Sequence, residues 1–295
     1  MNGLLIIDKE KKMTSQDVCL RLKKILNVKK CGHNGTLDPN ATGVMVIGVN
    51  QGTKTLKLLN EHDKEYIATI IFGIDTDTLD LDGNVINTIS MEVTENKIID
   101  GMEYLKSQKQ QIPPLTSAVK VNGKKLYEYQ RKGISVDIPK RDVTLYNYEI
   151  VSPLRMVDSN YEIDIKVSVS KGYFIRSMAR DLGAYLGGCA VIKDLRRTKS
   201  GEYKIEDAKK ISKVKESDII PIKEFFKLPK VMVKDYMIPL VKNGITMDQR
   251  QTDIHGAFFV DSKEGILAIY EEVAPLKYKP LLIFGGDNSG SNSSK

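Results

Sequence analysis

Residues 32–43, with the sequence Gly-His-Asn-Gly-Thr-Leu-Asp-Pro-Asn-Ala-Thr-Gly, lie between an amphipathic helical pattern and a buried-strand pattern. Three glycines and one proline in this stretch predict a loop of defined shape, because glycine adopts positive φ at little cost and proline fixes φ. The loop contains one carboxylate, Asp38, between Leu37 and Pro39. An Asp-Pro turn is the ordinary explanation of such a carboxylate. The apolar flanks and a nearby histidine and hydroxyls favour a partly buried functional group instead.

Composition excludes several classes of protein. The chain has 295 residues, of which 41% are hydrophobic and 28% charged, which is ordinary for a globular protein with a substantial core. No apolar run approaches the ~18 residues that a membrane span requires, and the N-terminus lacks the pattern of a signal peptide. We therefore expect a cytoplasmic protein without membrane contact. The net charge of +7 points weakly to a polyanionic partner.

Cysteine and histidine spacing gives no metal site. The three cysteines, Cys19, Cys31 and Cys189, are odd in number and far apart, which argues against a disulfide framework and a CxxC site. The three histidines lack metal-ligand spacing as well. We expect chemistry that uses carboxylates and bases, with no metal and no cofactor.

Hydrophobic periodicity predicts an α+β fold with a mixed, mostly antiparallel sheet and flanking helices. Segment 75–83 is acidic, but its spacing does not fit an EF-hand, so a solvated loop is the expectation. Strands are expected over 3–8, 44–49, 64–72, 143–151, 161–170 and 189–195, and helices over 15–26, 53–59, 94–108, 126–132 and 175–186.

The pattern divides into a main part and a small C-terminal part. Residues 1–230 form the predicted catalytic domain, with a basic hairpin and helix inserted at about 115–140 and a charged helical connector over 206–228. Residues 231–285 contain short strands with turn signals and predict a small β domain. Residues 286–295 form a polar, low-complexity tail that we expect to be mobile.

Two further side chains stand out as partners for Asp38. Arg176 is expected in the first turn of a helix, where the dipole disfavours a cation, so an anionic neighbour is indicated. An arginine beside Asp38 would hold that carboxylate in a bidentate geometry. Tyr66 would offer a ring for stacking on a base, although an ordinary strand aromatic is the default explanation of its position.

The stretch Gly-His-x-Gly-Thr-Leu-Asp-Pro-x-Ala-Thr-Gly resembles the catalytic loop of the bacterial tRNA pseudouridine synthase B (TruB) family. The resemblance covers about residues 3–204 and includes Lys64-Glu65-Tyr66, a Thr-x-Thr-x-Asp-x-x-Gly loop at 76–83, Ile175-Arg176-Ser177 and Leu195-Arg196-Arg197-Thr198. Separate motifs in the family order make chance agreement far less probable than for one motif.

The resemblance implies a role for each matching residue. Asp38 matches the nucleophile, Arg176 the arginine that pairs with it, and Tyr66 the tyrosine that packs on the target uracil. Leu195 matches the leucine that walls the base pocket, and His33 the histidine that stacks with flipped T-loop nucleotides.

Two segments depart from the family pattern. The family has Lys-Pro-x-Gly-x-Thr-Ser before the first helix, whereas residues 9–15 here lack both the proline and the glycine. If that turn needs positive φ at Lys12, strain or a rerouted loop is expected. Phe174 replaces a tyrosine of the family, so a hydrogen bond from that hydroxyl to the uracil is lost.

The implied reaction isomerises uridine by breaking the C1′–N1 bond and making C1′–C5. One ionised carboxylate suffices, whether it attacks C1′, attacks C6 or deprotonates the sugar to give a glycal. The uridine must first leave its stack, which costs a few kcal/mol and least in a loop.

The implied partner is tRNA, bound through its T arm and acceptor stem, with the T-loop uridine at position 55 as target. Basic residues near the catalytic segments would bind RNA, among them Lys171, Arg141, Arg196 and Arg197. The C-terminal module resembles a PUA-like domain, and we expect a monomer. A non-catalytic RNA-binding protein, a tRNA-folding chaperone and a synthase with another RNA target remain as alternatives.

Overall fold

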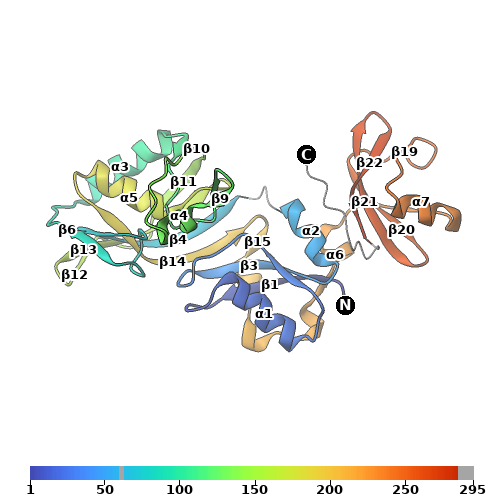
Figure 1. Cartoon of the computed structure of the whole chain (residues 1–295), viewed down its shortest axis with the longest axis horizontal. Coiled ribbons are helices and arrows are strands. Elements are labelled where there is room, and N and C mark those ends of the chain that lie inside the picture. The colour runs from blue at the N-terminus through green and yellow to red at the C-terminus, as the bar shows by residue number, and fades with distance from the viewer. Residues whose placement is uncertain (60–62, 285–295) are drawn as a thin grey trace.

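The computed structural model describes residues 1–59 and 63–284. It contains an 11-stranded sheet and, at the C-terminal end, a 5-stranded sheet (Figure 1). The main path across the large sheet is β11 (Leu145–Ile150), β13 (Asn160–Val169), β4 (Lys64–Phe72), β14 (Ala190–Ser200), β3 (Thr42–Val49), β1 (Gly3–Lys9) and β16 (Lys209–Lys210). Strands that pair beside this path are β2 (Cys31–Asn34), β12 (Arg155–Val157), β15 (Tyr203–Lys204) and β17 (Ile220–Pro221).

The pairing is mostly antiparallel, as predicted. Within the large sheet, β1 with β16 and β3 with β14 pair in parallel, while β1 with β3 and β4 with β13 and β14 are antiparallel. The helices lie around this sheet in the same domain, so the predicted α+β class is confirmed.

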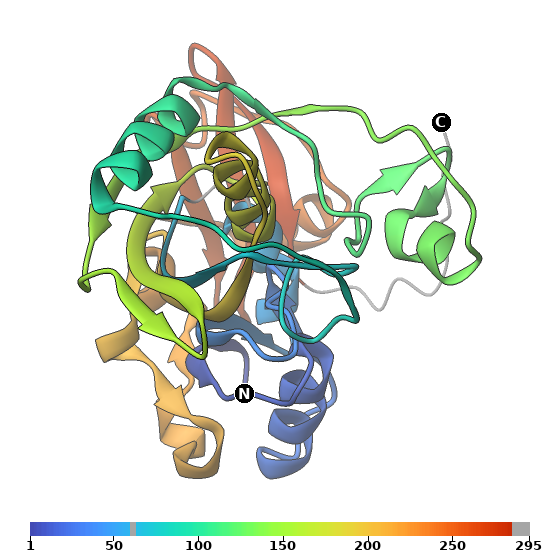
Figure 2. The same ribbon diagram turned by 90° about the vertical axis from the view of Figure 1, so that its left-hand side faces the viewer.

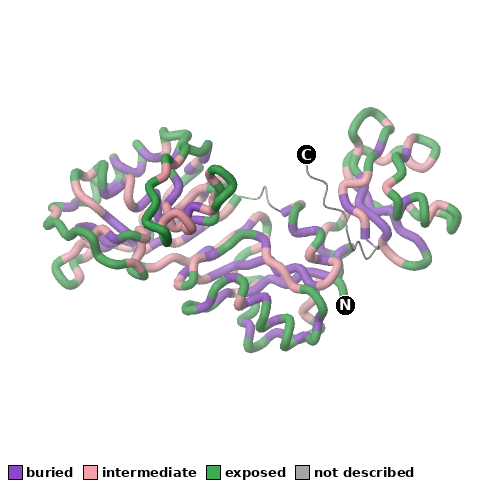
Figure 3. The backbone as a smooth tube through the Cα atoms, in the orientation of Figure 1, coloured by how far each residue is buried: buried purple, intermediate pink, exposed green. Residues whose placement is uncertain are grey.

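Strand β1 is apolar at successive positions because the sheet is covered on both faces there. Leu5 and Ile7 belong to one core with residues of α1 (Ser15–Ile25). Leu4 and Ile6 belong to a second core, which includes Phe259 of the C-terminal sheet. A strand buried on both faces needs apolar side chains in both directions, which explains the uninterrupted run. In Figure 3 this part of the sheet is mostly purple, the colour of buried residues.

Strand β4 alternates as its sequence predicts. Tyr66, Ala68, Ile70 and Phe72 are all buried and join the core under α3 (Glu95–Ser107) and α5 (Ile175–Tyr185). Figure 2 shows these two helices side by side over the sheet. These four alternate positions therefore form one buried face of β4.

An arm projects from the sheet between β7 (Gln110–Gln111) and β10 (Arg141–Asp142), which pair with each other at its root. The arm carries the hairpin β8 (Lys120–Val121) and β9 (Lys124–Lys125) and the helix α4 (Leu126–Arg131). Asn122 and Gly123 both have positive φ, as the Asn-Gly hairpin signal requires. In Figure 2 the arm lies far to the right of the helices.

Segment 206–228 is not the helical connector that its charge pattern suggested. It contains β16 and β17, both of which pair with β1. The prediction was wrong because β1 has backbone groups on its outer edge that need hydrogen-bond partners, and this distant segment supplies them. The rest of the segment forms short turns, η2 (Ile205–Asp207), η3 (Ile211–Lys213), η4 (Glu216–Asp218) and the helix α6 (Ile222–Phe226).

The predicted small β module corresponds to the 5-stranded sheet. Its strands are β18 (Lys230–Met232), β20 (Ala257–Ser262), β21 (Gly265–Ala274), β22 (Lys277–Ile283) and β19 (Met247–Asp248), with η5 (Asp235–Met237) and α7 (Ile238–Lys242) beside them. The remaining elements are α2 (Gly52–Thr55), η1 (Leu56–Leu59) and the hairpin β5 (Ile74–Thr76) and β6 (Val85–Thr88). The polar tail lies outside the described residues. Among the helices of residues 1–59 and 63–284, none is long and apolar enough to cross a membrane.

Candidate active site

The loop around Asp38 is shorter than the sequence suggested. Residues 32–34 already belong to β2, which pairs with β3, so the irregular part runs from Gly35 to Ala41. Gly43 has φ +108°, and a Cβ there would lie 2.1 Å from the carbonyl oxygen of Arg197. Glycine is therefore required for β14 to pair with β3 beside the loop.

Hydrogen bonds from two buried side chains hold the backbone on each side of Asp38. Leu37 is buried, and its N–H and carbonyl both hydrogen-bond to the Ser15 hydroxyl, at 2.9 and 3.1 Å. On the other side, Nζ of Lys9 donates to the carbonyls of Pro39 and Ala41, at 2.8 and 2.6 Å. Burial lowers the pKa of Lys9 to about 8, against the opposing attraction of Asp38. These contacts fix the backbone on each side of the carboxylate.

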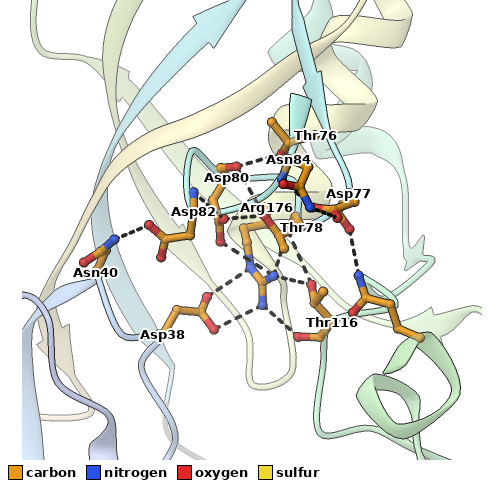
Figure 4. A network of polar contacts seen from close by, with 11 residues as sticks. Asp38, Asn40, Thr76, Asp77, Thr78, Asp80, Asp82, Asn84, Thr116 and Arg176 are labelled. Atoms are coloured by element: carbon orange, nitrogen blue, oxygen red, sulfur yellow. Dashed lines mark hydrogen bonds and ion pairs between the residues drawn. The ribbon is translucent and has the colours of Figure 1, made fainter. Parts of the chain in front are cut away.

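Asp38 and Arg176 meet in a bidentate ion pair (Figure 4). Nε of Arg176 lies 3.0 Å from Oδ2 of Asp38, and Nη2 lies 3.1 Å from Oδ1. The arginine side chain is only 7% exposed, whereas that of Asp38 is 37% exposed. The carboxylate is thus oriented by a buried cation and remains open to a ligand from solvent.

The remaining donors of Arg176 are also occupied. Nη1 donates to the Thr78 carbonyl at 2.8 Å and to the Thr116 hydroxyl at 2.5 Å. Nη2 donates to the Thr116 carbonyl at 3.3 Å. The guanidinium therefore joins α5 to the Asp38 loop, the acidic loop and the base of the arm, which are far apart in sequence.

Asp80 is a site residue that sequence reasoning missed. Segment 75–83 was expected to be a solvated acidic loop, but the Asp80 side chain is 18% exposed and Oδ2 lies 3.8 Å from Nη1 of Arg176. Burial raises the pKa of Asp80, and hydrogen bonding from Thr78 and the charge of Arg176 oppose that rise. The signal was present in the Thr-x-Thr-x-Asp spacing, since Thr78 Oγ1 donates to Oδ1 of Asp80 at 2.5 Å and Thr76 Oγ1 donates to the Asp80 carbonyl at 2.7 Å.

A small cavity opens beside the ion pair. Leu195 of β14 lines it together with Asp38 and Arg176. Asn40 hydrogen-bonds Asp82 at its rim. The other lining residues are Ala41, Asp80, Leu81, Ile192 and Lys193. The lining therefore combines apolar side chains with ionic ones beside the Asp38 carboxylate.

Other predicted residues lie around this centre without lining the cavity. Tyr66 is buried in the core that also contains Leu37 and Ala41. His33 lies on β2, half-buried, and burial lowers its pKa. Phe174 precedes α5 at its N-cap.

Arg141 and Lys171 lie further out. Arg141 is exposed at the root of the arm, and Lys171 lines a separate groove together with Asp63 and Tyr146. The structure thus brings Asp38, Arg176 and Leu195 to one cavity, which Arg141 and Lys171 do not line.

Two arginines expected to bind RNA have structural contacts. Arg196 pairs with Asp8 at 2.9 and 3.0 Å. Arg197 is 1% exposed, and its Nε donates to the Val44 carbonyl at 2.7 Å. The expectation of RNA contact is wrong for Arg197, because β14 carries this side chain into the interior rather than to the surface.

Metal-ligating side chains are not grouped at this site. Within the described ranges, no set of three or more His, Cys, Asp or Glu side chains is placed to hold a metal ion.

A buried arginine that orients one open carboxylate beside a small cavity with apolar and ionic lining is compatible with a pseudouridine synthase site, and comparison with known proteins shows that class. Residues 23–175 match the model described as TruB family pseudouridylate synthase (N terminal domain). The chain belongs to this family.

Curated relatives match along nearly the whole chain. The tRNA pseudouridine synthase B of Onion yellows phytoplasma is 38% identical over 287 residues, which cover 96% of this chain and 100% of the relative. That of Lactobacillus acidophilus is 38% identical over 294 residues, covering 96% and 98%. The chain is accordingly an isomerase of the pseudouridine synthase class, and its substrate is RNA.

Solved structures share the fold. An H/ACA RNP bound to a substrate RNA containing 2′-deoxyuridine aligns with a TM-score of 0.64 at 21% identity, covering 97% of this chain and 86% of the other. A Cbf5-Nop10-Gar1 complex aligns with the same TM-score at 24% identity, covering 97% and 84%. At this identity the likeness concerns the fold, which is the predicted α+β architecture.

Proposed function

We propose that this chain converts the T-loop uridine of tRNA, position 55, to pseudouridine, with Asp38 as the nucleophile. The observation that carries the assignment is the bidentate Asp38–Arg176 pair, in which the cation is buried and the carboxylate is open. The relatives named tRNA pseudouridine synthase B support tRNA as the RNA substrate.

The reaction needs no external electrons and leaves the composition of the nucleotide unchanged. The C1′–N1 bond breaks, the uracil turns beside Asp38, C1′–C5 forms, and the proton on C5 passes to Tyr66 and on to solvent while N1 gains one. Whether at C1′, at C6 or at the sugar proton, the first step needs an ionised carboxylate at a fixed position. The Arg176 guanidinium supplies both the position and the charge stabilisation.

Residues around the pair have assigned roles in this proposal. Leu195 walls the base, and Tyr66 packs on the uracil and takes the C5 proton. His33 stacks with the flipped T-loop nucleotides. Its lowered pKa supports that role, because a neutral imidazole stacks without the cost of desolvating a charge. Phe174 contributes a ring near the base and lacks the hydroxyl of the family tyrosine.

The RNA would lie along the basic arm and the C-terminal sheet. Lys171 and Arg141 bind phosphates, so affinity falls with rising salt. In this proposal residues 1–230 form the catalytic domain, and residues 231–285 form a PUA-like domain that contacts the acceptor stem. The protein acts as a monomer in the cytoplasm.

The test uses an unmodified tRNA transcript and maps pseudouridine after incubation with the protein. Wild type should modify position 55, and Asp38→Asn should form no product while it still binds the transcript. Asp194→Asn is the matched control, because it removes an exposed carboxylate whose partner is Lys11. A transcript with cytidine at position 55 controls for the target. An active Asp38→Asn, or a wild type without product, would overturn the assignment.

A further inference from the structure

Gln111 makes an unusual pair of contacts at the root of the arm. It is 6% exposed, and its amide spans the backbone of a single residue, Phe174. The Phe174 N–H donates to Oε1 of Gln111 at 2.9 Å, and Nε2 of Gln111 donates to the Phe174 carbonyl at 3.1 Å. We propose that Gln111 is a positioning residue for the reaction, which fixes the start of α5 so that Arg176 meets Asp38. The inference rests on the proposed roles of that ion pair.

The start of α5 needs an external anchor. Phe174 is its N-cap residue, and no side chain caps the helix there. Serine, threonine, aspartate or asparagine usually fills this position and satisfies the free N–H groups of the first turn. Arg176 in that turn adds a cation at the positive end of the helix dipole, which is unfavourable. Gln111 compensates by fixing the N-cap backbone itself, and the Phe174 carbonyl still accepts the helical bond from Met178 at 3.1 Å.

The residues that follow Gln111 hold the same helical turn. The Ile112 carbonyl accepts from the Ser177 hydroxyl at 2.9 Å and from Nη2 of Arg180 at 3.2 Å. Thr116 accepts from Arg176 itself. Ile112 contributes only its backbone carbonyl to these bonds, and Thr116 touches the guanidinium directly. Gln111 is therefore the side chain through which the anchor can be removed without touching the reacting groups.

The ion pair is sensitive to the position of this anchor. Its two contacts, at 3.0 and 3.1 Å, lie toward the long end of the usual N–H···O range, so a shift of the guanidinium away from Asp38 weakens both. Phe174 is two residues before Arg176, so a shift of the N-cap moves the guanidinium directly. Misplacement of a reacting group by 1 Å costs about 10²-fold in rate. RNA affinity depends mainly on phosphate contacts elsewhere, so we expect it to change little when the N-cap of α5 shifts.

The substitutions separate the two hydrogen bonds. Gln111→Leu is of similar size and removes both of them. Gln111→Glu keeps the acceptor for the Phe174 N–H, and its ionised carboxylate cannot donate to the Phe174 carbonyl. Protonation restores that donor, and burial beside a carbonyl oxygen raises the pKa of such a carboxyl group. The Gln111→Glu enzyme should therefore recover toward the wild-type rate as the pH falls.

Gln110 provides the matched control. It is the neighbouring glutamine of β7, is exposed, and its Nε2 donates to Asp142 at 2.9 Å. Gln110→Leu changes the same residue type in the same strand and leaves Phe174 untouched.

The experiment measures single-turnover pseudouridine formation and tRNA dissociation constants for the full-length variants. For Gln111→Leu we expect the rate to fall about 10- to 100-fold with affinity unchanged within about twofold, and for Gln110→Leu no change in either. The rate of Gln111→Glu divided by the wild-type rate should increase as the pH is lowered from about 8 to about 6.

Each outcome decides the question. Gln111 variants within about twofold of the wild-type rate, or a flat ratio against pH for Gln111→Glu, would overturn the inference, as would equal losses in rate and affinity. If Gln111→Leu does not fold, the pH ratio of Gln111→Glu alone is decisive. An active Asp38→Asn, run alongside, would instead mark failure of the proposed function.

Discussion

Arg176 lies between two carboxylates, with Asp38 in bidentate contact at 3.0 and 3.1 Å and Oδ2 of Asp80 at 3.8 Å from its Nη1. One guanidinium thus lies close to both carboxylates. Its planar fork matches the Asp38 carboxylate in a way that a lysine ammonium cannot.

Arg176→Lys should therefore lose most activity, although it keeps the charge. We expect a fall of about 10²-fold or more in single-turnover rate, because the bidentate geometry and the Thr116 contact are both lost. Binding of tRNA, measured by filter retention, should change little, and Lys171→Arg serves as a charge-conserving control. Turnover of Arg176→Lys near that of wild type would remove the positioning role of the guanidinium.

The raised pKa of Asp80 predicts that the reaction rate depends on pH. Burial raises its pKa above the ordinary range for aspartate, so protonation begins at higher pH than for an exposed carboxyl. The charged form attracts Arg176, and the rate should fall as the pH drops through this raised pKa. Asp80→Asn should be slower at neutral pH, by about tenfold, and should show a flatter acid limb. A pH–rate profile of both proteins tests this, and superimposable acid limbs would contradict it.

Lys9 links stability to alkaline pH. Its pKa is about 8 in the folded protein and about 10.5 when unfolded, so between these values the unfolded chain binds the additional proton. Stability contributed by this group therefore rises with pH across that window and is lost as the pH falls through about 8. Between neutral and alkaline pH, the free energy of unfolding of wild type should increase by up to about 3 kcal/mol relative to that of Lys9→Met.

Urea unfolding of wild type and Lys9→Met at neutral and at alkaline pH measures the difference in their free energies of unfolding. At neutral pH, Lys9→Met should already be less stable by about 1–3 kcal/mol, since the Pro39 and Ala41 carbonyls lose a donor. A gap that stays constant with pH would show that Lys9 has the same pKa in both states.

Lys12 has φ +62°, where the related family has glycine in the turn. A residue with a Cβ is disfavoured in this region by about 1–2 kcal/mol. Lys12→Gly should therefore stabilise the protein by about 0.5–1 kcal/mol after the entropic cost of glycine, seen as a higher melting temperature. Glu10→Gly, in the same turn at negative φ, should destabilise it. The same sign for both variants would argue against strain at Lys12.

Local sequence was sufficient for much of the fold. The strand expected over 64–72 is β4, and the helix expected over 15–26 is α1. The expected strain at Lys12 is present as a positive φ. These features depend on near neighbours in the chain, so propensity and periodicity are enough to predict them.

Distant contacts were predicted less well. Segment 206–228 looked helical by charge, yet it completes the edge of β1. Arg197 looked like an RNA ligand and is buried, whereas Asp80 looked solvated and lies beside Arg176. In each case the deciding partner is remote in sequence, and local pattern carries no information about it.

Local pattern in the sequence was enough to predict a shaped loop that presents Asp38 between Leu37 and Pro39, since glycine and proline act on the backbone where they stand. Long-range packing determines how the expected partner, Arg176, is held against that carboxylate. Asp80 and Thr116 meet the Arg176 guanidinium from the acidic loop and the base of the arm. Their geometry depends on anchors such as Gln111 and Phe174, 63 residues apart, because a side chain is positioned by whatever packs around its backbone.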